Sequence, residues 1–398
     1  MHRVAPVLVK PHSTKPLPPP WIPLSFFGAA LCALGSAFIW LLCADVQPFA
    51  LLHLLVVGVF ATVAMGALYQ FVPVVGMVKL RFFRLAGVHL VLAVCGTGAL
   101  VLGFQTGRFD LVTAGGALHG AGVLLEAFVL YATVRGAPIA FPARFAALAL
   151  TWLLATVLTG VVVGAQLLRG SLPQSLLHVH PILGLAGFYG TIITAVSFRL
   201  LRMFERVDAE VRAPLRVAGV AAAALVALIP VRYAMLALVL IAAVLVYDVS
   251  AIARRRNPAY QRETLWYSAV SFFGALTAAI AGATGNSALA VEIAAWFFAG
   301  AAVVGYLQRI VPFLWWIQRS RRSGARNIPA LKELNHSALG YAILALWTAA
   351  GLLWIVNAER GAAACAVAAW CGLLIQLARA FLLRKREAGA MYPRNTLH

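Results

Sequence analysis

Four histidines and one glutamate lie in the hydrophobic part of this sequence, and their chemistry could serve a site. They are His53, His119, His178, His180 and Glu292. Imidazole is the commonest side-chain ligand for haem iron, copper and zinc. An ionisable group inside a membrane is costly and usually faces the protein interior, so each of the five is a functional candidate. The alternative for each histidine is a hydrogen bond to a neighbouring helix with no further role.

His178 and His180 are two residues apart, which is about 200° around a helix. Their side chains therefore point to roughly opposite sides of a regular helix, and both cannot bind one metal from it. Pro181 follows directly and favours a helix start here, which would loosen this geometry. One histidine could face a cofactor while the other serves a second site or caps the helix.

Long apolar segments carry these residues. The chain is 63% hydrophobic and only 11% charged, whereas about a quarter of the residues in a soluble domain are charged. Runs of about 20 apolar residues, the length that spans a bilayer, recur from end to end. We therefore predict an all-α polytopic membrane protein with twelve transmembrane helices, near 24–44, 49–75, 85–103, 111–134, 145–168, 176–203, 214–230, 233–253, 265–284, 288–314, 337–356 and 361–383.

The predicted domain organisation is one membrane domain between two tails. A single kinked helix is the alternative for 214–253, although Pro230-Val231-Arg232 is typical of a tight turn. The basic, Pro-rich first tail, the membrane domain and the second tail are 1–23, 24–386 and 387–398.

The spans also divide into three units of four helices. The second helices of the first and third units agree in several positions: His53 and Glu292 are followed at equal offsets by Gly66 and Gly305, and then by a Val-Pro pair. Such self-similarity predicts an internal repeat. The three units are 24–134, 145–253 and 265–383.

The net charge of +20 invites a nucleic-acid partner, but its placement along the chain argues against one. With the N-terminus inside, the outer loops hold few of the 32 lysines and arginines. Basic residues concentrated in cytoplasmic loops are typical of membrane proteins. We predict cytoplasmic N- and C-termini in a bacterial-type inner or plasma membrane, with the lipid bilayer as partner. The basic residues of the outer loops are Arg108, Arg169, Arg232 and Arg360.

Helix direction places the five candidate residues in one layer. The second, fourth, sixth and tenth spans all enter from outside, so these residues share the outer part of the bilayer. Other polar residues fall near inner helix ends. There we expect His89 and His336 to have interfacial roles, and Glu126 and Asp248 to pair with inner-loop arginines.

Two segments resemble a known family. His53, followed by a Gly-rich helix that ends Tyr69-Gln70-Phe71-Val72-Pro73, together with twelve spans in three arcs of four, resembles subunit I of the haem–copper oxidase superfamily. The segment His178-Val179-His180-Pro181-Ile182-Leu183-Gly184 is also similar to small relatives of that subunit and to the NnrS family of nitric-oxide-response membrane proteins.

The resemblance implies that His53 binds a low-spin haem and that His178 or His180 occupies the place of a copper ligand. It stops at the seventh span, 214–230, which has no His-His pair. Glu292 and Trp296 stand where the oxidases have two haem-ligating histidines. Reduction of dioxygen or nitric oxide at a haem–copper centre is therefore not expected. A b-type haem or a metal held between the second and sixth helices remains.

Three functions follow. The first is a haem- and/or copper-binding protein that acts in electron transfer, gas response or cofactor handling, with a redox partner or other membrane subunits. Its cofactor-binding residues are His53, His178 and His180, and its metal candidates are His178, His180, His119 and Glu292. The second is a twelve-helix secondary transporter in which His180 and Glu292 couple protons. The third is a scaffold subunit whose histidines only pack.

Overall fold

The computed structural model describes residues 17–136, 140–171, 174–207, 210–228, 236–255, 262–323, 329 and 333–383, and within them the chain is helical and has no strand. Eleven of the helices in these ranges are long and apolar enough to cross a membrane, and a twelfth is shorter. The chain is therefore an all-α polytopic membrane protein, as the sequence predicts.

Nine helices are regular along their whole length. Their boundaries agree with the predicted spans to within a few residues, because the change from apolar to polar sequence sets both ends. They are α1 (Trp21–Cys43), α4 (Leu85–Thr106), α5 (Phe109–Val134), α6 (Phe141–Leu168), α9 (Ala213–Leu228), α10 (Leu236–Arg255), α11 (Glu263–Ala283), α14 (Ser337–Ile355) and α15 (Glu359–Leu382). The shorter helix is α9. α9 and α10 pack against each other, as two separate helices do, so the alternative of one kinked helix over 214–253 is wrong. The Pro230-Val231-Arg232 segment lies outside the described residues.

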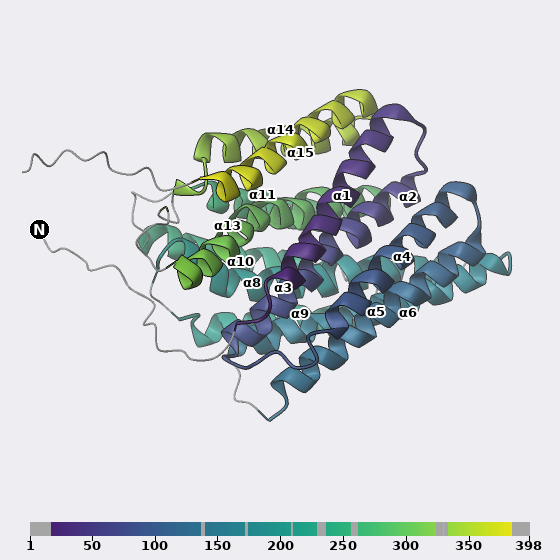
Figure 1. The fold of residues 1–398 in the computed structure, drawn as a ribbon. Coiled ribbons are helices and arrows are strands. Elements are labelled where there is room, and N and C mark those ends of the chain that lie inside the picture. Colours follow the sequence, from purple (N-terminus) through teal and green to yellow (C-terminus); the bar gives the residue numbers. More distant parts are fainter. Residues whose placement is uncertain are drawn as a thin grey trace, which may run out of the picture.

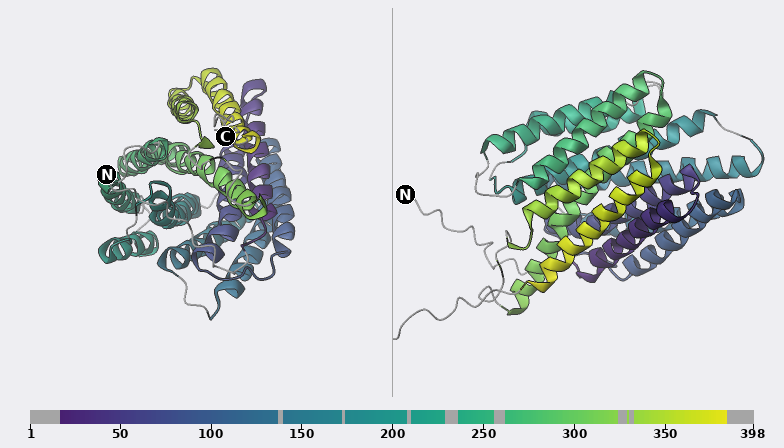
Figure 2. Two further views of the ribbon diagram at one scale, coloured as in Figure 1. Left: turned by 60° about the vertical axis from the view of Figure 1, so that its left-hand side comes forward. Right: turned by 90° about the horizontal axis from the view of Figure 1, so that it is seen from above.

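The helices run side by side between two faces of the bundle (Figures 1 and 2). We call the end at which α1 begins and α15 ends the near face, and the opposite end the far face. α1 and α15 pack against each other, and the indole N–H of Trp370 donates to the carbonyl oxygen of Leu31 at 3.0 Å. The first and last helices therefore lie together.

Three further spans each contain a π-helical segment between two α-helical parts. They are α2 (Pro48–His53), η1 (Leu54–Ala61) and α3 (Thr62–Val75); α7 (Gln174–Ile182), η2 (Leu183–Tyr189) and α8 (Gly190–Phe204); and α12 (Ser287–Ile293), η4 (Ala294–Gly300) and α13 (Ala301–Ser323). In their most apolar parts 67%, 83% and 67% of the residues are buried, against at most 50% in any other span. These spans form the centre of the bundle.

The π segments change which backbone groups are free. A π turn displaces the i→i−4 hydrogen-bond pattern and leaves carbonyl oxygens available to other donors. The Tyr189 hydroxyl of η2 donates to the carbonyl oxygen of Val56 in η1. Within the same span, the Thr62 hydroxyl donates to the carbonyl oxygen of Val57 at 3.0 Å. The first of these bonds ties two central helices together directly.

The first and third π-containing spans also pack alike. Gly66 follows η1 and Gly305 follows η4 at the same distance along the chain. A Cβ added at Gly66 would lie 2.5 Å from the Cβ of Phe26, and one at Gly305 would lie 2.5 Å from the Cβ of Tyr267. In both places the absent side chain lets an aromatic residue of the preceding helix pack against the central helix.

The tenth predicted span is longer in the structure than in the sequence prediction. It continues past residue 314 to Ser323. Its extension carries interfacial residues: the Trp315 ring lies 5.0 Å from the Arg319 guanidinium carbon, and the Trp316 indole N–H donates to the carbonyl oxygen of Pro329 at 3.1 Å. Tryptophan and arginine are favoured at the membrane–water boundary, so the helix can continue beyond the end of its apolar segment.

Candidate functional site

Two of the predicted ligands lie next to each other near the far face. His53 is the last residue of α2, and His180 lies in α7. Their imidazole ring centres are 6.2 Å apart, and the ring planes are inclined by only 17°. Phe104 of α4 stacks on His53 with a centroid distance of 4.6 Å. The sequence-predicted pair from the second and sixth spans is therefore brought together.

Each imidazole is held by a backbone carbonyl group. His53 Nδ1 lies 2.7 Å from the carbonyl oxygen of Phe49, and His180 Nδ1 lies 2.9 Å from that of Thr156. A carbonyl oxygen only accepts hydrogen bonds, so Nδ1 carries the proton in both rings. In each neutral imidazole the lone pair for a ligand is consequently on Nε2. A metal-binding histidine is commonly oriented by such a bond from its other nitrogen.

Helix α6, the fifth span, shapes the space around His180. A Cβ added at Gly160 would lie 2.8 Å from His180 Cε1 and 3.2 Å from Nδ1, so only glycine leaves room for this ring. The Thr159 hydroxyl is also 3.4 Å from His180 Nδ1. Thr156, Thr159 and Gly160 lie at helical spacing on one face of an otherwise apolar helix. This spacing is the feature of the sequence from which their shared position beside a polar group could have been predicted.

The donor set can be compared with what different metals require. When two imidazole nitrogens point at one metal ion, at about 2 Å from each, the ring centres are about 6 Å apart, close to the 6.2 Å between these ring centres. Bare zinc or copper(II) takes three or four protein ligands. Among the described residues no group of three or more His, Cys, Asp or Glu side chains could hold a metal ion. Two imidazoles alone suit the axial positions of a haem iron.

The other predicted candidates lie apart from this pair. His178 is exposed, in keeping with its position across the helix from His180. Glu292 is half-buried in α12, and no described residue makes a hydrogen bond or ion pair with it. His119 faces α4, where Gly96 packs against its backbone. The four metal candidates therefore do not assemble into one metal site.

Aromatic residues fill the core beside the third π segment. Trp296 of η4 and Trp347 of α14 stack with ring centres 4.9 Å apart. Each indole N–H donates to the other residue's carbonyl oxygen, at 2.9 and 3.1 Å. Phe38 and Phe60 contact this pair. Trp296 stands where the resemblance implies a haem ligand, and its indole is committed to packing.

A second polar cluster is buried between α3, α4 and α5. The Tyr69 hydroxyl and His89 Nδ1 are 3.0 Å apart, and His89 is fully buried. The expected interfacial role of His89 is wrong, because α1, α3 and α5 cover the start of α4. His119 and Glu126 lie near this pair. A Cβ at Gly122 would lie 2.8 Å from the His89 ring.

One member of this cluster lacks a partner. His119 interacts with the backbone of Ala93, whereas both carboxyl oxygens of Glu126 are buried with no hydrogen-bond partner in the described part of the chain. The expected pairing of Glu126 with a loop arginine is therefore not found among the described residues. Glu126 points inward from α5, so the loop guanidinium groups do not reach it. Asp248 does pair with an arginine, Arg202, although this arginine is in helix α8.

No protein-family model matches this sequence, and no curated protein matches it significantly.

Proposed function

We propose that this membrane protein binds one haem b between α2 and α7 and passes single electrons through it. His53 and His180 would be the two axial ligands. The observation that carries the proposal is the pair of neighbouring, nearly parallel imidazoles, with ring centres 6.2 Å apart and each Nδ1 bound to a backbone carbonyl group. A haem iron with two imidazole ligands exchanges one electron at a potential tuned by burial and hydrogen bonding.

The number of donors favours haem over copper. A macrocycle supplies four ligands of its own, so two histidines complete the shell, whereas a bare copper ion would lack a third protein ligand here. The site is less suited to binding a gas molecule, because His53 and His180 would together leave no free position on the iron. The absence of a His-His pair from α9 and the packing of Trp296 against Trp347 also argue against a haem–copper centre.

We infer that the near face lies in the cytoplasm. Lys79, Arg81 and Arg84 lie between α3 and α4 on that side, and Arg254 and Arg255 end α10 there. Cytoplasmic enrichment in basic residues would orient the bundle this way. The paired histidines would then lie toward the outside, and a redox partner would meet the far face or another subunit in the membrane.

The test is the haem content of three single variants purified from haem-replete cells. His53→Ala and His180→Ala should each lose most of the bound haem, because each removes one axial ligand. His178→Ala is the matched control: it lies two residues from His180 but is exposed, and should keep its haem. Full haem in both ligand variants, with normal folding, would overturn the assignment.

A secondary transporter is the second candidate, and the buried cluster around Glu126 favours it. The unpartnered Glu126 carboxyl group and the buried imidazoles of His89 and His119 could exchange a proton. In proteoliposomes with a pH gradient, a transporter would move protons with its substrate, and Glu126→Gln would stop this flux. A haem-free protein with such a flux would support this function instead.

A further inference from the structure

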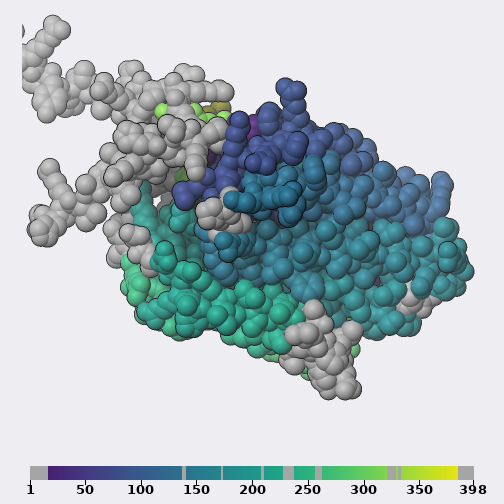
Figure 3. Space-filling view, turned by 90° about the horizontal axis from the view of Figure 1, so that it is seen from below, coloured from purple at the N-terminus to yellow at the C-terminus, as the bar shows by residue number. Residues whose placement is uncertain are grey.

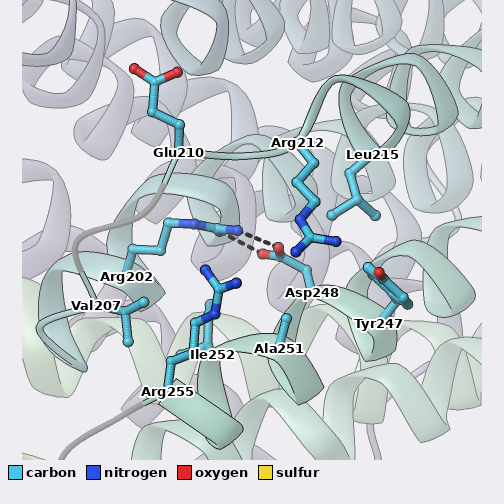
Figure 4. A pocket seen from close by; sticks show the side chains of 10 residues that line it. All are labelled: Arg202, Val207, Glu210, Arg212, Leu215, Tyr247, Asp248, Ala251, Ile252 and Arg255. Atoms are coloured by element: carbon cyan, nitrogen blue, oxygen red, sulfur yellow. Dashed lines mark hydrogen bonds and ion pairs between the residues drawn. The ribbon is translucent and has the colours of Figure 1, made fainter.

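A small hollow opens at the near face, between the end of α8, the start of α9 and the end of α10. Its charged lining consists of three arginines and two acids. Figure 4 shows the guanidinium groups of Arg202, Arg212 and Arg255 turned toward Asp248, while the Glu210 carboxylate points away. The hollow is small and open to the surface, so it suits a single charged group and not a whole enclosed ligand.

The hollow carries more positive than negative charge. Arg202 binds the buried Asp248 carboxylate through two nitrogens, at 2.7 and 2.5 Å. Glu210 is 93% exposed and pairs with Arg216, which does not line the hollow. Arg212 and Arg255 are exposed and pair with no carboxylate in the described part of the chain. Two guanidinium charges therefore remain for an anion.

Arg212 reaches the hollow from the start of a helix. Arg212 directly precedes α9, a helix of 16 residues, and Leu215 in its first turn lines the hollow. In that turn Pro214 has no backbone N–H group, and the N–H groups of Leu215 and Arg216 donate to the carbonyl oxygen of Arg212, so the positive potential of the hollow comes from its guanidinium groups. Arginine binds phosphate through a planar fork of donors.

The outer sides of α9 and α10 are apolar next to the hollow. Val217 is 68% exposed, and Val246 and Tyr247 are each 50% exposed. Figure 3 shows these helices, in teal to green, along one edge of the outer surface. In a membrane, such side chains contact lipid chains. A lipid whose headgroup lies in the hollow could therefore also pack its acyl chains along these helices. A soluble anion has no acyl chains and would lack this apolar contact.

We propose that this hollow binds the phosphate group of an anionic phospholipid in the leaflet at the near face. Arg212 and Arg255 hold the phosphate oxygens, and the Arg202–Asp248 pair forms the floor of the site. The site lies at the face opposite the paired histidines, and the proposal does not depend on the haem. A soluble phosphate ion carries the same binding group as the lipid, so the experiment must distinguish a phospholipid from free phosphate.

The experiment measures binding of phosphatidylglycerol to the delipidated full-length protein in a neutral detergent, by native mass spectrometry. Arg212→Gln with Arg255→Gln should weaken binding about 25-fold, from about a fivefold loss for each basic group. Arg84→Gln with Arg254→Gln is the matched control, because it removes the same charge from exposed positions outside the hollow. The control should change binding less than threefold, and phosphatidylcholine should bind weakly to all forms.

Equal losses in the two double variants would overturn the proposal, because charge alone would then explain binding. Binding of inorganic phosphate to the same protein forms is measured as the second part of the experiment. If phosphate binds as tightly as the lipid, with the same dependence on Arg212 and Arg255, the site takes a soluble anion and the lipid assignment is wrong. Size-exclusion profiles and thermal unfolding of the variants establish that they fold.

Discussion

Gly160→Ala tests the contact that shapes the paired-histidine site. The added Cβ would lie 2.8 Å from His180 Cε1, whereas carbon atoms in contact are at least about 3.5 Å apart, so the ring must move by about 0.7 Å. The bond from His180 Nδ1 to the Thr156 carbonyl oxygen measures 2.9 Å. A shift of that size would take it outside the normal range for a hydrogen bond.

The expected effect on stability is a near cancellation. Loss of the His180 hydrogen bond costs about 1 kcal/mol, and replacing glycine by alanine within a helix contributes about 0.8–1.0 kcal/mol in the other direction. Gly98→Ala is the matched control, because a Cβ there meets nothing within 4 Å. The free energy of unfolding should therefore rise by up to about 1 kcal/mol in Gly98→Ala and change little in Gly160→Ala.

Haem affinity should separate the two variants more strongly. Disturbing a group that orients a metal ligand commonly costs about 10–100-fold in affinity, so Gly160→Ala should bind haem that much more weakly than the native chain. Haem titration of the apo-protein, followed by the absorption of the bound form, gives this ratio. Equal affinity and equal stabilisation in both variants would refute the argued contact between Gly160 and His180.

Two further substitutions test the buried polar groups, both by unfolding the purified protein in mixed micelles. Tyr69→Phe leaves the fully buried His89 Nδ1 without its partner and should lower the free energy of unfolding by about 1–3 kcal/mol; an unchanged value would mean that another group or water satisfies the ring. Asp248→Leu leaves the Arg202 guanidinium buried and unpaired and should cost about 3–5 kcal/mol, most of which Arg202→Met in the same chain should restore. A double variant no more stable than Asp248→Leu alone would contradict this.

Hydropathy predicts most of the fold because a bilayer imposes a minimum apolar length on every span. The boundaries of α4, α6 and α11 follow from that length alone. The π segments η1, η2 and η4 could not be predicted, because they lie in stretches apolar on all sides, where one extra residue per turn leaves no trace in the pattern. The end of α13 was missed for a different reason: its last turns carry interfacial aromatic and basic residues.

The candidate site was predictable in part. Both histidines lie near the start of a helix, and the two helices enter the membrane from the same side. The sequence therefore indicates that His53 and His180 could lie close together. Sequence could not separate His180 from His178, since that depends on how α7 is rotated. Nor could it reveal the contact between Tyr69 and His89, because burial of a helix end depends on which neighbours cover it.

The central claim is that His53 and His180 hold a haem, and one measurement tests it most directly. It is the reduced-minus-oxidised optical spectrum of the full-length protein, purified in detergent from haem-replete cells, with metal analysis of the same sample. The proposal predicts sharp bands of a low-spin b-type haem, with about one iron per chain and no stoichiometric copper. A colourless, metal-free and folded protein would contradict it.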